Sequence, residues 1–263
     1  MTRRERRPGA APTAAARGTA VGLALAAAVA LAGCASAGPT ATTPPPTVSA
    51  PPTEEATPMP VTPTIPPAEA TALLVAAIAT GGLAEVRHAL EQGADPNARD
   101  ADGRPVVVTA TRAERADLVQ VLLEAGADPD AKDAIEDSAY LYAGAEGLSD
   151  ILRLTLEHGA DVTSTNRYNG TALIPASEHA HVETVRILLA AGVPVNHVNR
   201  LGWTALHEAI VLGTGSEDHI ETVRLLLAAG ADPAIPDGDG VLPRRLAEQR
   251  GFTAIVAEID AAS

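Results

Sequence analysis

The stretch LEQGADPNARD at residues 90–100 returns in altered form four more times before the chain ends. Its counterparts are LEAGADPDAKD at 123–133, LEHGADVTSTN at 156–166, LAAGVPVNHVN at 189–199 and LAAGADPAIPD at 227–237. The glycines at the fourth position of these stretches are separated by 33, 33, 33 and 38 residues. A nearly constant step of roughly 20 to 50 residues is typical of a stacked repeat array. The sequence therefore predicts a solenoid from about residue 67 to the end.

An amphipathic helix is predicted just before each of these glycines. In the fourth repeat Val182, Val185, Leu188 and Leu189 fall on one helical face, and residues 220–227 repeat the arrangement. We expect these apolar faces to pack against the neighbouring repeats.

The ends of the helices are also marked in the sequence. Gly192 and Gly230 follow the last apolar residues, where a left-handed C-terminal cap is expected. Thr171 and Thr204 stand where the first helix of a repeat needs an N-cap oxygen. The fifth repeat is longer by five residues near 214–218, which we place between its two helices.

These blocks, together with GWTALHEA at 202–209, resemble the ankyrin repeat. The resemblance covers the whole region and implies a β-turn followed by two antiparallel helices in about 33 residues. The predicted fold class is therefore all-α, an ankyrin-repeat solenoid of about six helix-turn-helix repeats with β-hairpin turns, spanning residues 67–263. The predicted repeats are 67–99, 100–132, 133–165, 166–198, 199–236 and 237–263.

Repeats two and three depart most from the ankyrin pattern among the internal repeats. They carry PVVV at 105–108 and SAYL at 138–141, and Glu136 occupies a turn position where repeats two, five and six have glycine and repeat four has asparagine. Glutamate tolerates a positive φ poorly, so we expect a distorted turn there. Ala89 and Thr155 weaken otherwise apolar stripes. These two repeats should be less regular than repeats four and five.

The N-terminal region has the order of an export signal. Residues 20–32 form an apolar run of 13 residues, too short for a membrane-spanning helix. Before this run stand the basic residues Arg3, Arg4, Arg6, Arg7 and Arg17.

LAGC at 31–34 holds the only cysteine of the chain and resembles the lipobox of bacterial lipoproteins. The resemblance implies cleavage before Cys34, acylation of its sulfur and removal of residues 1–33 as a signal peptide. Two acyl chains would give a durable membrane anchor, because one chain binds only marginally. The alternatives are a signal peptide cut nearby or an uncleaved anchor, with Cys34 a bystander.

Residues 34–67 follow as a predicted disordered tether after the lipidated cysteine. Positions 36–67 contain 11 of the 21 prolines and eight threonines, without apolar periodicity. Fully extended, such a segment reaches roughly 100 Å. The alternative is a proline-motif ligand for another protein.

The charge of the chain argues against nucleic acid as a partner. The full sequence carries a formal charge of −14. Removing residues 1–33 takes away five arginines and one glutamate, which leaves 14 basic and 32 acidic residues and a charge of −18. An acidic surface repels phosphate backbones.

A search for catalytic chemistry finds no constellation that supports an enzyme, a metal site or a cofactor. His207, His181 and His219 occupy positions that the ankyrin pattern fills with structural histidines. His179 and His181 are two residues apart, so they do not share one helical face. The sequence contains no nucleophile elbow and no P-loop, and DGDG at 237–240 lacks the later ligands of a calcium loop.

The predicted function is recognition of a protein, because ankyrin stacks offer an extended concave face. The family's variable positions, placed on repeats four and five, are Arg167, Tyr168, Glu178, His179, Arg200, Leu201, Trp203 and Leu212. Aromatic residues and arginine are enriched among binding hot spots. The alternative for Trp203 is that it only covers the neighbouring hairpin.

We therefore expect a monomeric module, exported and lipid-anchored on the outer face of the cell membrane, that captures or scaffolds another envelope or exported protein. An inhibitory, immunity-like protein that neutralises a partner effector is the alternative. An enzyme with dispersed catalytic residues is a third, less favoured reading.

Overall fold

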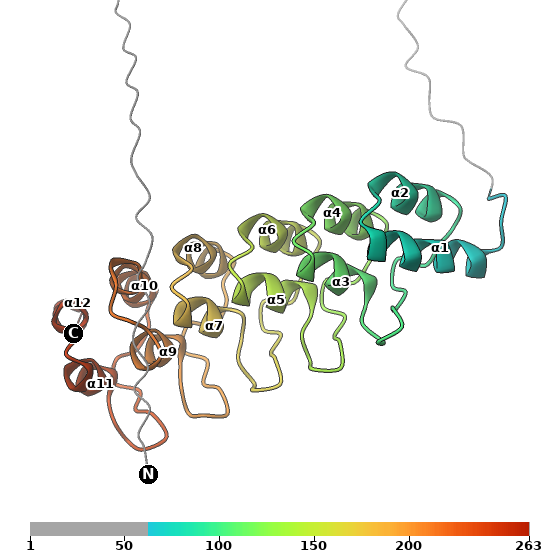
Figure 1. The fold of residues 1–263 in the computed structure, drawn as a ribbon. Coiled ribbons are helices and arrows are strands. Elements are labelled where there is room, and N and C mark those ends of the chain that lie inside the picture. Colours follow the sequence, from blue (N-terminus) through green and yellow to red (C-terminus); the bar gives the residue numbers. More distant parts are fainter. Residues whose placement is uncertain (1–62, 263) are drawn as a thin grey trace, which may run out of the picture. The chain divides into compact units, whose positions relative to one another are not determined.

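The computed structural model describes residues 63–262 of the chain. The predicted signal peptide, Cys34 and nearly all of the predicted tether lie outside these residues. The described part contains twelve α-helices and no β-strand (Figure 1). In chain order the helices are α1 Pro67–Thr80, α2 Leu83–Glu91, α3 Val106–Arg112, α4 Ala116–Glu124, α5 Ala139–Ala145, α6 Ser149–Glu157, α7 Leu173–Glu178, α8 Val182–Ala190, α9 Ala205–Val211, α10 Glu217–Ala228, α11 Pro243–Arg250 and α12 Thr253–Ala262.

Consecutive helices form pairs, and the pairs stack side by side (Figure 1). The odd-numbered helices make one row and the even-numbered helices a second row, while long loops project beside the odd-numbered row. Within the rows α5 packs on α7 and α7 on α9, as α6 packs on α8 and α8 on α10. This arrangement, in which neighbours supply the contacts, confirms the predicted all-α solenoid.

One buried column shows how the core tolerates two weak positions. The column runs through Ala89, Leu122, Thr155, Leu188 and Leu226, all of which are fully buried. The Thr155 hydroxyl donates to the backbone oxygen of its own helix three residues earlier, at 2.8 Å. Its polar atom is therefore satisfied without interrupting the apolar stack.

The projecting loops are built on one recurring device. The side-chain oxygen Oδ1 of the first loop residue accepts hydrogen bonds from the backbone N–H groups two and four residues later, at 2.8 to 3.1 Å. These first residues are Asp100, Asp133, Asn166, Asn199 and Asp237. Side chains of Asp and Asn are suited to such local turns. Across residues 63–262 only one isolated β-bridge forms, between Arg99 and Pro105, so the expected β-hairpins are hydrogen-bonded loops without strands.

The expected distortion at Glu136 was wrong. Glu136 adopts a left-handed φ of 64°, and its N–H donates to the Asp133 carbonyl at 3.1 Å. The equivalent bond from Gly202 to Asn199 measures 3.0 Å. The two bonds to Asp133 Oδ1 offset the strain of a left-handed glutamate, which is roughly 1 to 2 kcal/mol. Repeats two and three are accordingly as regular as repeat four.

The predicted N-caps divide into one that is confirmed and one that is wrong. Thr204 caps α9 in a reciprocal capping box with His207. The Thr171 hydroxyl instead is buried without a hydrogen-bond partner, and α7 begins after Ala172. Pro175 lacks an N–H, so the Ile174 N–H goes to the Thr171 carbonyl at 3.1 Å and leaves the hydroxyl without a donor.

The predicted C-caps are confirmed, and the longer fifth repeat is largely absorbed by a helix. Gly192 and Gly230 have φ of 85° and 90°. Helix α10 has 12 residues, against nine in α8. Ser216 caps it by accepting from the His219 N–H at 3.4 Å, while His219 Nε2 donates to the Glu178 carbonyl at 3.0 Å. His219, rather than the insertion itself, thus ties α10 to the preceding repeat.

Candidate functional site

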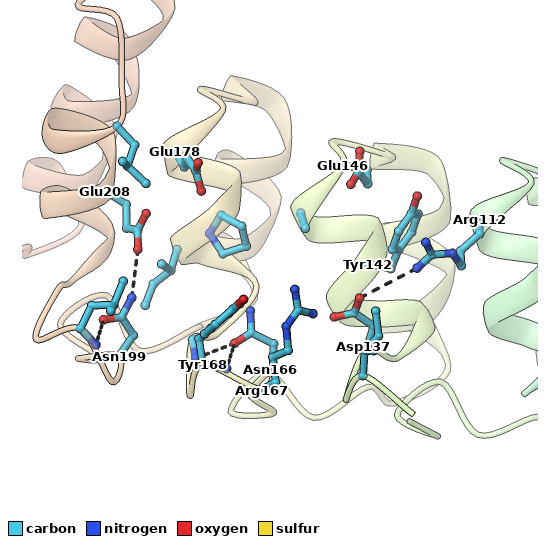
Figure 2. Close-up of a pocket in the computed structure, with 17 residues that line it drawn as sticks. Arg112, Asp137, Tyr142, Glu146, Asn166, Arg167, Tyr168, Glu178, Asn199 and Glu208 are labelled. Carbon is cyan, nitrogen blue, oxygen red and sulfur yellow. Dashed lines mark hydrogen bonds and ion pairs between the residues drawn. The ribbon is translucent and has the colours of Figure 1, made fainter. Parts of the chain in front are cut away.

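A groove of about 460 Å³ runs along the odd-numbered helices and the loops of repeats two to five (Figure 2). We call it the groove throughout. It is lined by Arg112, Ile135, Asp137, Tyr142, Ala145, Glu146, Asn166, Arg167, Tyr168, Gly170, Ile174, Pro175, Glu178, Asn199, Leu201, Glu208, Leu212. Apolar, aromatic and charged side chains therefore alternate along one concave surface.

Five of the eight predicted contact residues line the groove, namely Arg167, Tyr168, Glu178, Leu201 and Leu212. Three of these are large side chains left open: Tyr168 is 52% exposed, Leu201 55% and Leu212 47%. The structure thus brings together residues from two loops and from the C-terminal ends of two helices. That they contact a partner stays a prediction.

The remaining three predicted residues lie outside the groove lining. Arg200 is exposed; its N–H donates to the Tyr168 carbonyl at 2.9 Å and its guanidinium donates to the Arg167 carbonyl. His179 is exposed, with its ring centroid 5.6 Å from that of His181. Trp203 is half-buried. Arg200 therefore joins two loops, whereas the part played by Trp203 stays a prediction.

The end of the groove in repeats two and three, formed by Arg112, Asp137 and Tyr142, is internally paired; we call it the paired end. The Arg112 guanidinium lies 4.5 Å from the centroid of the Tyr142 ring and 4.0 Å from Asp137 Oδ2. Burial raises the pKa of Asp137, and the nearby Asp133 raises it further, whereas Arg167 and Arg112 lower it. The charges here already have partners within the chain.

The middle of the groove presents an ordered aromatic side chain. The Arg167 guanidinium lies 4.6 Å from the centroid of the Tyr168 ring. Asn166 Oδ1 accepts from the N–H groups of Tyr168 and Gly170, at 2.9 and 3.0 Å. Because the loop is fixed before contact, less conformational entropy is lost when a partner covers Tyr168.

The end of the groove in repeats four and five is formed by Glu178 and Glu208; we call it the acidic end. Glu208 is only 5% exposed, and Asn199 Nδ2 donates to its Oε1 at 2.9 Å. Burial raises the pKa of Glu208 to about 7, the neighbouring Glu178 adds to the rise, and the bond from Asn199 opposes it. Within residues 63–262 neither carboxylate has an ion-pair partner.

Sequence reasoning missed Arg112, Asp137, Tyr142 and Glu208. A signal was present for Arg112, because it stands 66 residues, or two repeats, before Glu178 and so occupies the same position of its repeat. Glu208 has no comparable signal in the sequence, since it simply follows the capping-box residue His207 in the first turn of a helix.

No group of three His, Cys, Asp or Glu side chains within 63–262 is placed to hold a metal ion. None of the helices in this part of the chain combines the length and the apolar character required to cross a membrane.

Stacked helix pairs with projecting loops define a helical repeat solenoid. Comparison with known proteins specifies the family. A family profile described as ankyrin repeats (3 copies) matches residues 140–237. An ankyrin repeat domain from Acinetobacter baumannii AYE is 53% identical, with a TM-score of 0.70; the match covers 72% of this chain and 96% of that one. The chain belongs to the ankyrin-repeat family.

Two further solved structures show the same fold. The ankyrin repeat protein EF0377 is 33% identical over 72% of this chain and 97% of its own length, with a TM-score of 0.70. The ankyrin repeat domain of Bcl-3, a member of the IkappaB family, is 25% identical over 73% of this chain and 86% of its own, with a TM-score of 0.65. No curated protein sequence gives a significant match. Ankyrin repeats are generally protein-interaction modules, and their fold is typically a scaffold without enzymatic activity.

Proposed function

We propose that this chain is a lipid-anchored, exported interaction module that captures another envelope or exported protein through its groove. One observation carries the proposal: Tyr168, Leu201 and Leu212 are large, exposed and gathered along one concave surface. Exposed apolar and aromatic side chains grouped in this way are typical of protein-binding surfaces. The hydrogen-bonded loops supply the rigid platform that such a surface needs.

The anchoring half of the proposal rests on LAGC at residues 31–34 behind the apolar run 20–32. Acylation of Cys34 would hold the domain at the outer face of the cell membrane, and residues 36–67 would give it reach. The negative charge of the chain would be repelled by anionic lipid, which suits a domain that is tethered to the membrane but held away from its surface.

Metabolic labelling with fatty acid tests the anchor. Cys34→Ala should abolish labelling and leave an uncut precursor or a released form, whereas the neighbouring Ser36→Ala should label normally. Unchanged labelling and membrane retention of Cys34→Ala would contradict the anchor.

Crosslinking on intact membranes, followed by purification of the full chain in mild detergent, tests the groove. The double variant Tyr168→Ala, Leu201→Ala should lose the crosslinked partner. Leu242→Ala is the matched control, because Leu242 is also exposed but lies outside the groove.

The identity of the captured protein separates the two forms of the proposal. A housekeeping envelope protein would support scaffolding, and an effector-like protein would support inhibition. If no specific protein is captured, or if the groove variant captures as well as the wild type, the groove is not the binding surface.

A further inference from the structure

The acidic end of the groove holds a carboxylate at a helix position, Glu208, that the fold does not require to be charged. Repeat two makes the equivalent contact with a neutral group: the Thr109 hydroxyl donates to Asp100 Oδ2 at 2.8 Å. Thr109 and Asp100 stand 99 residues before Glu208 and Asn199, at the same positions of their repeat. In repeat five the roles are exchanged, and Asn199 donates to Glu208. The helix position can therefore be neutral, with the carboxylate on the loop, where Arg104 lies 4.0 Å from Asp100 Oδ2.

Burial of the Glu208 carboxylate is also unfavourable. A charge removed from water costs several kcal/mol unless a cation or several hydrogen bonds compensate it. Glu208 has the single bond from Asn199, and the adjacent Glu178 adds repulsion. Figure 2 shows both carboxylates directed into the same part of the groove from the neighbouring helices α9 and α7.

The cations on the helices packed against α9 are engaged elsewhere. On α11 the Arg244 guanidinium pairs with Asp260 and Glu248, and Arg245 pairs with Glu248. Arg250, the last residue of α11, donates to the backbone carbonyls of Val211 and Gly213.

The situation on α10 and α7 is the same. On α10, Arg224 pairs with Glu221 and Glu258, and His219 is held between Ser216 and the Glu178 carbonyl. Helix α7 contributes Glu178 itself, another acid. No cation among these elements reaches the acidic end.

From these observations we propose that the acidic end receives an arginine or lysine side chain from an exposed segment of the captured protein, paired with Glu208 and Glu178. The inference rests on the proposed function of the groove and specifies the chemistry of the partner. A cationic head group would meet two carboxylates, and charge complementarity of this kind favours one partner over others.

The surroundings fit the rest of such a side chain. Leu212 lies one turn beyond Glu208, since its N–H donates to the Glu208 carbonyl at 3.0 Å, and it is half exposed. Leu201 lines the same part of the groove. The apolar stem of arginine or lysine can pack on these leucines while its head reaches the carboxylates.

The chain's own N-terminal region does not supply the cation after cleavage at Cys34. Residues 34–62 contain no lysine or arginine, and their only charged residues are Glu54 and Glu55. A tether that begins at Cys34 would therefore bring no cation to the acidic end, which leaves a partner molecule as the source.

Selection from a library of random 12-residue peptides displayed on phage tests the inference with the full chain in mild detergent. Peptides that bind the wild type but not the Tyr168→Ala variant bind in the groove. These peptides should share one arginine or lysine flanked by apolar residues. In a synthetic copy, replacing that residue by citrulline or norleucine should weaken binding at least tenfold, as should Glu208→Gln. The two changes together should weaken binding little more than either alone, because they remove one interaction.

Two further variants keep the outcome interpretable. Glu183→Gln removes a carboxylate of α8 that pairs with Arg153 outside the groove, and it should bind like the wild type. The variant Glu208→Thr removes the carboxylate and leaves a neutral threonine, the residue type of the equivalent position Thr109, facing Asn199; it should fold yet bind weakly.

The possible failures are distinguishable. Groove-binding peptides that lack a cation, or that bind Glu208→Gln as tightly as the wild type, would overturn the inference and leave the proposed function standing. If no selected peptide depends on Tyr168, both the inference and the proposed function fail.

Discussion

The two ends of the groove use opposite electrostatics on the same scaffold. At the paired end Arg112 lies between Asp137 and Tyr142, so the partly buried carboxylate has a cation within the chain. At the acidic end Glu208 is more deeply buried and has only the Asn199 amide, with Glu178 beside it. The backbone is nearly the same, because the loop device of Asp133 recurs at Asn199.

This difference shows that repeat architecture separates stability from recognition. The loops and the buried column fix the position of each helix, so a side chain on the concave face can change its charge without loss of the fold. The paired end contributes to its own stability. The acidic end carries a stability cost when Glu208 is ionised, which an external cation would relieve, and such costs concentrate at functional sites.

The largest expected effect comes from neutralising the acidic end. Because the folded-state pKa of Glu208, about 7, lies above its ordinary value of 4.5, the unfolded chain releases this proton first as the pH rises. The stability contributed by the protonated carboxyl is therefore present below pH 4.5 and lost as the pH rises to about 7. At pH 8, Glu208→Gln should raise the free energy of unfolding by on the order of 3 kcal/mol.

Urea unfolding of the full chain in mild detergent at pH 5 and pH 8 measures this effect. The stabilisation by Glu208→Gln should be much smaller at pH 5, where the wild-type carboxyl is mainly protonated. Glu183→Gln serves as the control, since its exposed ion pair should change stability little at either pH. A variant that is no more stable than the wild type at pH 8 would show that the buried carboxylate is better compensated than its contacts indicate.

Most of the fold was predictable because each repeat is marked by short-range sequence features. The glycines at 33-residue spacing set the period, and Thr204 and Gly230 mark a helix start and a helix end as expected. The N-cap predicted at Thr171 was wrong because Pro175, four residues later, has no N–H to donate to the Thr171 carbonyl. The Ile174 N–H takes that carbonyl instead of the Thr171 hydroxyl. Glu136 misled because the compensating bonds to Asp133 depend on loop geometry that φ preferences alone do not reveal.

The candidate site was predictable only in part. Exposed loop and helix-end positions of repeats four and five identified Tyr168 and Leu212, which do line the groove. The same positions of repeats two and three were not considered, so Arg112 was missed. Glu208 depends on burial, which arises from the packing of α7 against α9 and has no local signature in the sequence.

The second effect in size concerns the aromatic side chain between the two ends. Tyr168→Ala should weaken binding of a groove-selected peptide by roughly 2 kcal/mol, about thirtyfold, because an ordered, exposed tyrosine loses its contact area. The melting temperature of the variant should hardly change, since Tyr168 is 52% exposed. Isothermal titration calorimetry and thermal melts on the same sample give both values.

Trp203→Ala is the informative comparison for Tyr168→Ala. If half-buried Trp203 is a contact residue, affinity should fall while the melting temperature is kept; if it covers the neighbouring loop, stability should fall and affinity per folded molecule should not. Unaltered affinity in a folded Trp203→Ala, Tyr168→Ala double variant would place the binding surface on other repeats.

A smaller effect is expected from the loop beside the paired end. Glu136→Gly should stabilise the protein by about 1 kcal/mol or less, because glycine removes the left-handed strain but gains more freedom in the unfolded chain. Gly202→Ala, at the same loop position of repeat five, should destabilise: φ is 79° there, and an added Cβ would lie 2.8 Å from the Gly238 nitrogen. Chemical unfolding of both variants measures the contrast, and destabilisation by Glu136→Gly would mean that the glutamate side chain contributes a contact of its own.

The smallest effect on stability should come from opening the paired end. Arg112→Ala removes a partly exposed ion pair and a ring contact, together worth about 1 kcal/mol or less. The pKa of Asp137, already raised by burial and by Asp133, should rise further because a cation that lowers it is gone. The carboxyl resonance of Asp137, followed by NMR from pH 3 to pH 8, measures that change.

Binding of the cationic peptides selected for the acidic end gives the second measurement on Arg112→Ala. If the variant binds a second peptide more weakly, in addition to the first, internal pairing is what distinguishes the two ends. The other outcome is that Arg112→Ala binds these peptides with the affinity and stoichiometry of the wild type although the pKa of Asp137 rises. An unpaired carboxylate is then not sufficient for binding, and the shape set by Leu201 and Leu212 must be part of the recognition.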